Sequence, residues 1–175
     1  MSYVVLACRL VVAGLFAWAA ASKLRRQHLR DFAGVLTAAR LVPGRVAAPA
    51  AATVVAVELL LVGLIFVPST ARAGLTVAAG WTVALTAALL PLRRRSLACR
   101  CFGTATPVGV HHLIRNLGIF LTAAGGALGA ALTPAGPLQW PAVLVTAIAA
   151  TTAILAVGLT DQLFTAPSAY RAGAS

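Results

Sequence analysis

The stretch Val46–Val67, with the sequence VAAPAAATVVAVELLLVGLIFV, decides the fold of this chain. At a helical rise of about 1.5 Å per residue it extends over about 33 Å, close to the roughly 30 Å thickness of the hydrocarbon core of a bilayer. Its only charged residue is Glu58. An apolar run of this length is typical of a transmembrane helix, whereas the buried helix of a soluble protein is usually shorter.

Four further stretches have a similar length and composition. They are Tyr3–Ser22, Ala71–Leu92, His112–Thr133 and Trp140–Thr160. Of the 175 residues, 61% are hydrophobic and only 10% are charged, whereas a soluble domain is typically about 45–50% apolar and about 25% charged. The sequence therefore predicts an all-α, polytopic membrane helical bundle with five spans. We expect residues 1–166 to form a single membrane domain and residues 167–175 to be a flexible tail.

The first stretch is predicted to be a retained helix and not a cleaved signal peptide. The small residues Ala19–Ala21 would suit a cleavage site, but no basic segment precedes the apolar run. A basic cluster follows it instead, and positive charge in that place holds the end of a span in the cytoplasm.

Between the first two spans, the segment Gln27–Leu41 is too polar and too short to cross a bilayer. Its apolar residues recur at roughly helical spacing: Leu29, Phe32, Val35, Leu36 and Ala39. This pattern predicts an amphipathic helix that lies at the membrane interface, and Pro43-Gly44 is expected to end it.

The chain is strongly basic, with 14 Lys and Arg residues against 3 Asp and Glu residues. In a soluble protein this balance would suggest nucleic-acid binding. No aromatic or basic recognition module is visible, however, and the basic residues crowd between the apolar stretches, as they do in cytoplasmic loops of membrane proteins. We therefore expect the lipid bilayer as a partner and no nucleic acid.

The distribution of basic residues over the loops predicts the orientation. The first loop contains Lys23, Arg25, Arg26, Arg30, Arg40 and Arg45, and the third contains Arg93, Arg94, Arg95 and Arg100. The second and fourth loops together contain only Arg72. Because cytoplasmic loops carry the excess of Lys and Arg, we expect a multi-pass protein of the cell membrane with its N-terminus outside and its C-terminus in the cytoplasm.

The third loop also carries the concentrated chemistry of the chain, the sequence Cys99-Arg100-Cys101-Phe102-Gly103. A disulfide within Cys-X-Cys would close a very small ring, which is expected to be strained and relatively oxidising, as suits thiol–disulfide exchange. Arg100 lies between the sulfurs and Arg115 begins the next span, and such cations favour the reactive thiolate. The pattern therefore predicts a redox-active pair on the cytoplasmic side.

Two other interpretations of these cysteines stay open. They can be two buried, inert residues, since Cys-X-Cys alone is a weak signal. They can also bind a metal together with His111 and His112, although adjacent histidines are awkward ligands for one tetrahedral ion and more often begin a helix at the interface.

Glu58 is expected to need a partner, because an ionisable group at this depth is costly in the bilayer. The expected partner is Arg9 in the first span, whose depth differs from that of Glu58 by about 5 Å, a gap that a long Arg side chain can bridge. The pair is either a structural contact that fixes helix packing or a polar site for a proton or beside a quinone. Lys23 is expected to extend to the interface, and a role in steadying a thiolate is secondary.

The order of these features resembles the MauE family of methylamine-utilisation membrane proteins, within the wider DoxX-like membrane group. The resemblance covers roughly residues 5–125 and rests on Arg9, Ser22-Lys23-Leu24, Phe32, Leu36, Pro43, Glu58-Leu59, Gly63, Cys99–Gly103 and Arg115-Asn116. It implies a four-helix DoxX-like core, to which the fifth span is added. It also implies that Cys99 and Cys101 are a redox pair, with Lys23, Glu58 and Arg115 as supporting positions.

By this resemblance the partner would be a thioredoxin-like protein similar to MauD, and the outcome would be disulfide formation in a protein of methylamine metabolism. The family's substrate disulfides lie outside the cytoplasm, whereas the charge distribution puts Cys99 and Cys101 inside. The cysteines then pass on reducing equivalents from a cytoplasmic donor, or the loop is reached from outside, or the number of spans differs from five. Electron passage would need an acceptor, for which a quinone is one candidate. A non-enzymatic membrane scaffold is the alternative function, and a small metal-binding membrane protein is a second alternative.

Overall fold

The computed structural model describes residues 3–94, 98–99, 106–107, 109–133 and 139–163. For residues 93–94, 98–99, 106–107 and 160–163 only the backbone is described. These parts of the chain form six helices and one short hairpin: α1 (Tyr3–Lys23), α2 (Arg26–Ala38), α3 (Gly44–Phe66), α4 (Ala71–Arg94), β1 (Ala98–Cys99), β2 (Thr106–Pro107), α5 (Val110–Leu132) and α6 (Trp140–Leu163). The tail expected at residues 167–175 lies outside the described residues.

Five of the helices, α1, α3, α4, α5 and α6, are long and apolar enough to cross a membrane. The prediction of a polytopic helical bundle is therefore confirmed. Large apolar side chains cover the outside of the bundle, where Leu60 is 61%, Ile148 is 67% and Leu132 is 74% exposed. A soluble protein rarely exposes so continuous an apolar surface, whereas the hydrocarbon of a bilayer solvates it.

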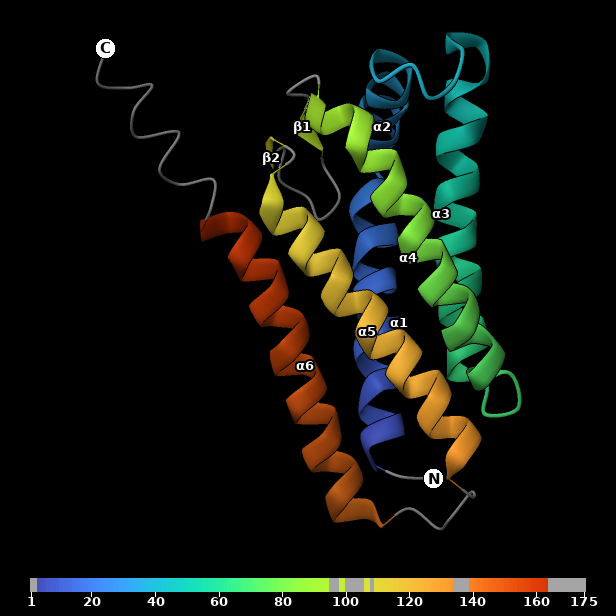
Figure 1. Ribbon diagram of the computed structural model, residues 1–175, viewed down its shortest axis with the longest axis vertical. Helices are drawn as coiled ribbons and strands as arrows, with labels where there is room; N and C mark the ends of the chain where they lie inside the picture. The colour runs from blue at the N-terminus through green and yellow to red at the C-terminus, as the bar shows by residue number, and fades with distance from the viewer. Residues whose placement is uncertain (1–2, 95–97, 100–105, 108, 134–138, 164–175) are drawn as a thin grey trace.

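Helix α1 runs through the middle of the bundle and contacts all five other helices (Figure 1). The core forms around its apolar face, where Val12 and Phe16 pack against Leu61 of α3, Leu75 of α4 and Ile119 of α5. Helix α6 packs mainly on α1. The spans α1, α3, α4 and α5 thus share one core, and α6 packs on the outside of it.

Small residues let the helices approach closely, which is how membrane helices associate when lipid is as apolar as their side chains. A Cβ atom at Gly126 of α5 would lie 2.7 Å from Cβ of Cys8 in α1. At Gly158 of α6 it would lie 2.5 Å from the indole of Trp18. Cys8 is thus a packing residue of the α1–α5 contact, as we expect for a single cysteine inside a span.

The amphipathic helix α2 ends in a different way from the one expected. The Arg40 amide donates to the Thr37 carbonyl at 2.9 Å and the Leu41 amide to the Leu36 carbonyl at 3.0 Å, with Arg40 at a positive φ of 57°. This is the Schellman arrangement, which satisfies the last free carbonyls of a helix. Pro43-Gly44 does not end α2. The expectation was wrong because Pro and Gly also suit the start of a helix, and here Pro43 precedes the first turn of α3.

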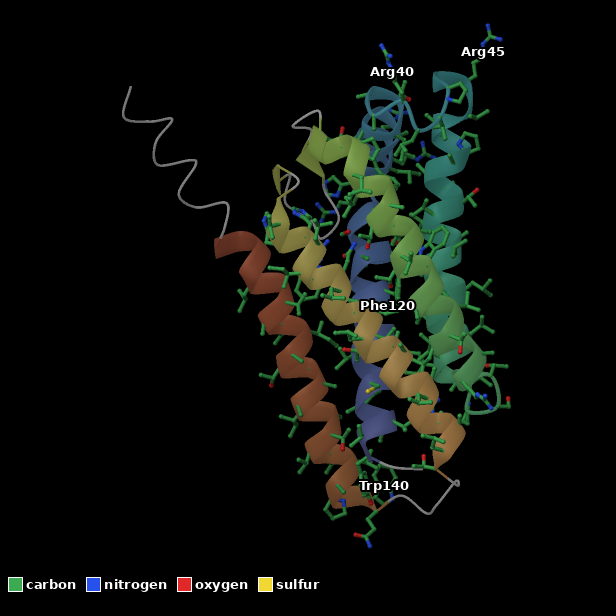
Figure 2. All side chains as sticks on the ribbon, viewed as in Figure 1. Arg40, Arg45, Phe120 and Trp140 are labelled. Atoms are coloured by element: carbon green, nitrogen blue, oxygen red, sulfur yellow. The ribbon has the colours of Figure 1, made fainter. Side chains whose placement is uncertain are left out.

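The two ends of the bundle differ. Helix α2 and the β1–β2 hairpin lie at one end, together with the start of α3, and the N-terminus and the α3–α4 turn lie at the other (Figure 1). Arg40 and Arg45 project from the hairpin end, whereas Trp140 lies at the opposite end (Figure 2). The hairpin connects α4 to α5, and β1 lies against α2. The basic segments that flank α2 and the strand that contains Cys99 therefore lie at the same end of the bundle.

Candidate functional site

A cavity of about 120 Å³ lies inside the bundle, between α1, α2, α3, α4 and α5. Its walls are mostly aliphatic and aromatic. The polar side chains that line it are Lys23, Glu58, Thr82, Arg115 and Asn116. Three of the positions expected to support the cysteines, Lys23, Glu58 and Arg115, are thus brought together around one space although they are far apart in the sequence.

A buried ion pair forms one side of this cavity. The Lys23 ammonium donates to both carboxylate oxygens of Glu58, at 2.8 and 3.0 Å, and to the Ala19 carbonyl at 3.0 Å. The side chains of Lys23 and Glu58 are only 4% and 2% exposed. Because an ammonium has three N–H donors, these contacts account for all of them. The pair is therefore held in one geometry, and neither charge is left alone in the apolar interior.

Arg9, the partner expected for Glu58, makes other contacts. Its guanidinium donates to the carbonyl of Ile65, at 3.0 Å from Nε and 2.8 Å from the terminal nitrogen, and to the Phe66 carbonyl at 3.0 Å. Those carbonyls belong to the last turn of α3, where carbonyl groups have no amide of their own helix to accept from. Arg9 thus caps α3 at the end where a positive charge is favourable.

The direction of the side chains explains why Lys23 and not Arg9 pairs with Glu58. Helices α1 and α3 run antiparallel, since Arg9 near the start of α1 contacts the end of α3 and Lys23 at the end of α1 contacts Glu58, further back in α3. Side chains of a helix tilt towards its N-terminus. Lys23 and Glu58 therefore lean towards each other, whereas Arg9 leans away. Depth along the membrane does not distinguish Arg9 from Lys23, because it leaves out the direction of their side chains.

Other groups close the cavity around the pair. The side-chain amide of Asn116 donates to the Thr86 hydroxyl at 3.0 Å, which in turn donates to the Thr82 carbonyl at 2.7 Å. The ring of Phe32 on α2 lies 5.8 Å from the Lys23 ammonium, within cation–π distance. Helix α2 thereby covers the ion pair on this side.

Sequence reasoning gave no role to Thr82 and Thr86. Their spacing of four residues puts both on one face of α4, and two hydroxyls on the same face of a span are the signal that would have indicated a polar wall.

The cysteine segment begins in the hairpin. Cys99 of β1 pairs with Thr106 of β2 in an antiparallel arrangement. Cys101 and Gly103 lie outside the described residues, and of Cys99 only the backbone is described. The hairpin continues from α4, which lines the cavity through Leu89 and Leu92, into α5, which lines it through Arg115 and Asn116.

His112 is buried at the start of α5, and its Nδ1 accepts a hydrogen bond from the Gly109 amide at 3.4 Å. It thus satisfies a free amide at a helix start, in agreement with the interpretation of these histidines as helix-start residues. The rings of His111 and His112 are 4.1 Å apart. Among the described side chains, no three His, Cys, Asp or Glu residues gather in a way that would hold a metal ion.

The comparisons with known proteins agree with this architecture. No curated protein and no solved structure matches the chain. The family model for the methylamine utilisation protein MauE matches residues 1–129, that is 129 of the 175 residues. The match includes α1 to α4, the hairpin and most of α5, and with them every residue of the cavity, and it ends before α6. The chain is therefore a multi-pass membrane protein that belongs to the MauE family.

Proposed function

We propose that this protein is a membrane thiol–disulfide redox protein that exchanges electrons with a thioredoxin-like partner through Cys99 and Cys101. The partner's dithiol loses two electrons and two protons as it becomes a disulfide, and the Cys99–Cys101 disulfide gains both as it becomes two thiols. The exchange passes through a mixed disulfide between one cysteine of each protein.

The observation that carries this proposal is the position of the cysteine segment. Cys99 ends a short strand of the hairpin at the end of the bundle, next to the interfacial helix α2 and not within a span. A thiol–disulfide centre must be reached by a folded partner, and a loop at the end of the bundle offers such access. The exposed arginines of α2 and its flanking segments belong to the same end, and cations close to a thiol favour the thiolate, which is the nucleophile in exchange.

The charge asymmetry supports a cytoplasmic location of the hairpin. The exposed residues Arg25, Arg26, Arg30, Arg40 and Arg45 all belong to this end, through α2 and the segments that flank it. The donor would then be a cytoplasmic dithiol protein, and the electrons would enter the protein from that side.

The roles of the buried residues follow from their contacts. Lys23 and Glu58 hold the wall of the cavity below the hairpin, and Arg115 adds a cation to the same wall. Arg9, at the far end of α1, contributes through the cap of α3. In this scheme Lys23, Glu58 and Arg115 support the hairpin indirectly, because they fix the cavity wall, and Arg9 stabilises the end of α3.

The proposal is tested by trapping the mixed disulfide. Purified, oxidised protein is mixed with a thioredoxin that retains only its nucleophilic cysteine, and the adduct is followed on a non-reducing gel. Wild-type protein forms the adduct, whereas Cys99→Ser and Cys101→Ser do not, because neither variant has a disulfide to attack. Cys8→Ser is the matched control, since Cys8 packs against Gly126 at the other end, and it behaves as wild type. Equal adduct formation by the Cys99→Ser/Cys101→Ser double variant would sink the proposal.

A further inference from the structure

We infer that the cavity between α1 and α5 binds the ring of a lipid-soluble quinone. Its size is the first argument. An engineered apolar cavity of about 150 Å³ takes up benzene, whereas pockets for drug-sized ligands exceed about 300 Å³. The cavity of about 120 Å³ is thus of a size that one six-membered ring fills.

The walls favour a ring that is apolar on its faces. Phe16, Phe32, Leu85 and Leu89 contribute broad apolar surfaces from α1, α2 and α4. A freely soluble polar metabolite would lose most of its hydration against these apolar surfaces. A planar molecule from the bilayer loses none, because it is already in an apolar solvent.

The polar groups favour a ligand with hydrogen-bond acceptors. Lys23 uses its three donors on Glu58 and Ala19, so it is not available to a ligand. Asn116 uses one amide N–H on Thr86 and has a second. Arg115 lies on the same wall. The second amide N–H of Asn116 is thus a donor on the cavity wall, and a carbonyl oxygen of a quinone is an acceptor that suits it.

The cavity also has a route for an alkyl tail. The α2 residues that line the cavity, Phe32, Val35 and Leu36, are only partly buried. Leu41 follows α2, also lines the cavity and is 38% exposed. The space therefore reaches the surface of the bundle beside α2, at the level of the interface. A ring can occupy the cavity while its tail leaves along this helix into the lipid.

A quinone in this place supplies the electron acceptor that the hairpin needs. When Cys99 and Cys101 form a disulfide they release two electrons and two protons, and a quinone that takes up both becomes a quinol. The cavity lies between the helices that the hairpin connects, α4 and α5. This role as acceptor rests on the proposed thiol–disulfide function, whereas binding of the ring rests on the cavity alone.

The test measures binding of an alkyl benzoquinone to the purified full chain in lipid nanodiscs, through quenching of tryptophan fluorescence. Ala88→Phe fills the cavity and is expected to weaken binding at least tenfold. Ala87→Phe is the matched control, because Ala87 is exposed on the adjacent, lipid-facing position of α4. Equal affinity of both variants and wild type would overturn the inference.

A second pair of measurements tests the acceptor chemistry without adding bulk. Asn116→Leu is expected to weaken quinone binding about tenfold, and an alkyl benzene of equal tail length, which lacks the carbonyl oxygens, is expected to bind wild type at least tenfold more weakly than the quinone. If the alkyl benzene binds as well as the quinone, the site is a ring pocket without the proposed specificity and the inference fails.

The thiol-free variant separates this inference from the proposed function. Cys99→Ser/Cys101→Ser is expected to bind the quinone with wild-type affinity, because no cysteine lines the cavity among the described residues. If the wild-type protein binds the quinone but forms no adduct with thioredoxin, the proposed redox function is wrong and the quinone site stands. If it forms the adduct but binds no quinone, the quinone site is wrong and the proposed redox function stands.

Discussion

At the scale of single residues, the position of a charge in a membrane bundle matters less than the direction in which its side chain leans. Arg9 and Lys23 are both buried basic residues of α1, yet the Glu58 carboxylate pairs with Lys23, at 2.8 Å. The sequence was sufficient to predict that Glu58 needs a basic partner from α1. It was not sufficient to choose the partner, since the choice depends on the register of two helices that only their packing defines.

This ion pair predicts an asymmetric response to substitution. Lys23→Met leaves the Glu58 carboxylate buried without its partner and is expected to lower the free energy of unfolding by about 3–5 kcal/mol. Adding Glu58→Gln to that variant removes the unpaired charge and is expected to recover most of the loss.

A double-mutant cycle in detergent unfolding measures this coupling, with Arg9→Met/Glu58→Gln as the matched cycle. Strong coupling in the Arg9 cycle and none in the Lys23 cycle would contradict the pairing.

At the scale of the elements, the spans follow from local composition and their contacts do not. Each span could be predicted because about 20 apolar residues in a row have few alternatives in a bilayer. The start of α3 came two residues earlier than expected, at Gly44, because a polar residue such as Arg45 is still helical at the interface. The cavity could not be predicted at all, since its walls come from five helices and each contributes only a few residues.

The close approach of α1 and α5 can be tested with neighbouring glycines. Gly126→Leu inserts a side chain where a Cβ would already lie 2.7 Å from Cys8. Such overpacking is expected to cost about 1–3 kcal/mol.

Gly125→Leu is the control, because a Cβ there would meet nothing within 4 Å. It is expected to leave stability unchanged or to raise it by up to about 1 kcal/mol through helix propensity. Thermal unfolding in detergent distinguishes the two. A larger loss of stability for Gly125→Leu than for Gly126→Leu would show that α1 and α5 do not pack in this way.

At the scale of the whole molecule, the two ends of the bundle set its orientation. The hairpin end carries the exposed arginines of α2 and of the loop before α3, whereas the turn between α3 and α4 has Arg72 beside it. Because Lys and Arg are retained on the cytoplasmic side, the hairpin is expected in the cytoplasm and the α3–α4 turn outside. The five spans then put the N-terminus outside and the end of α6 inside.

Single cysteines at the two ends test this orientation in intact cells. In a background without native cysteines, Ser69→Cys is placed in the α3–α4 turn and Gln27→Cys in α2, and both positions are exposed. A membrane-impermeant maleimide is expected to label Ser69→Cys at once and Gln27→Cys only after the cells are opened. Because both sites are exposed, each is the control for the other. Labelling of Gln27→Cys in closed cells would invert the bundle and bring the hairpin, with Cys99, to the outer face. Disulfide exchange would then take place with a partner outside the cell membrane, where the substrates expected from the MauE resemblance lie, so this experiment also decides which class of thioredoxin-like partner can reach the hairpin.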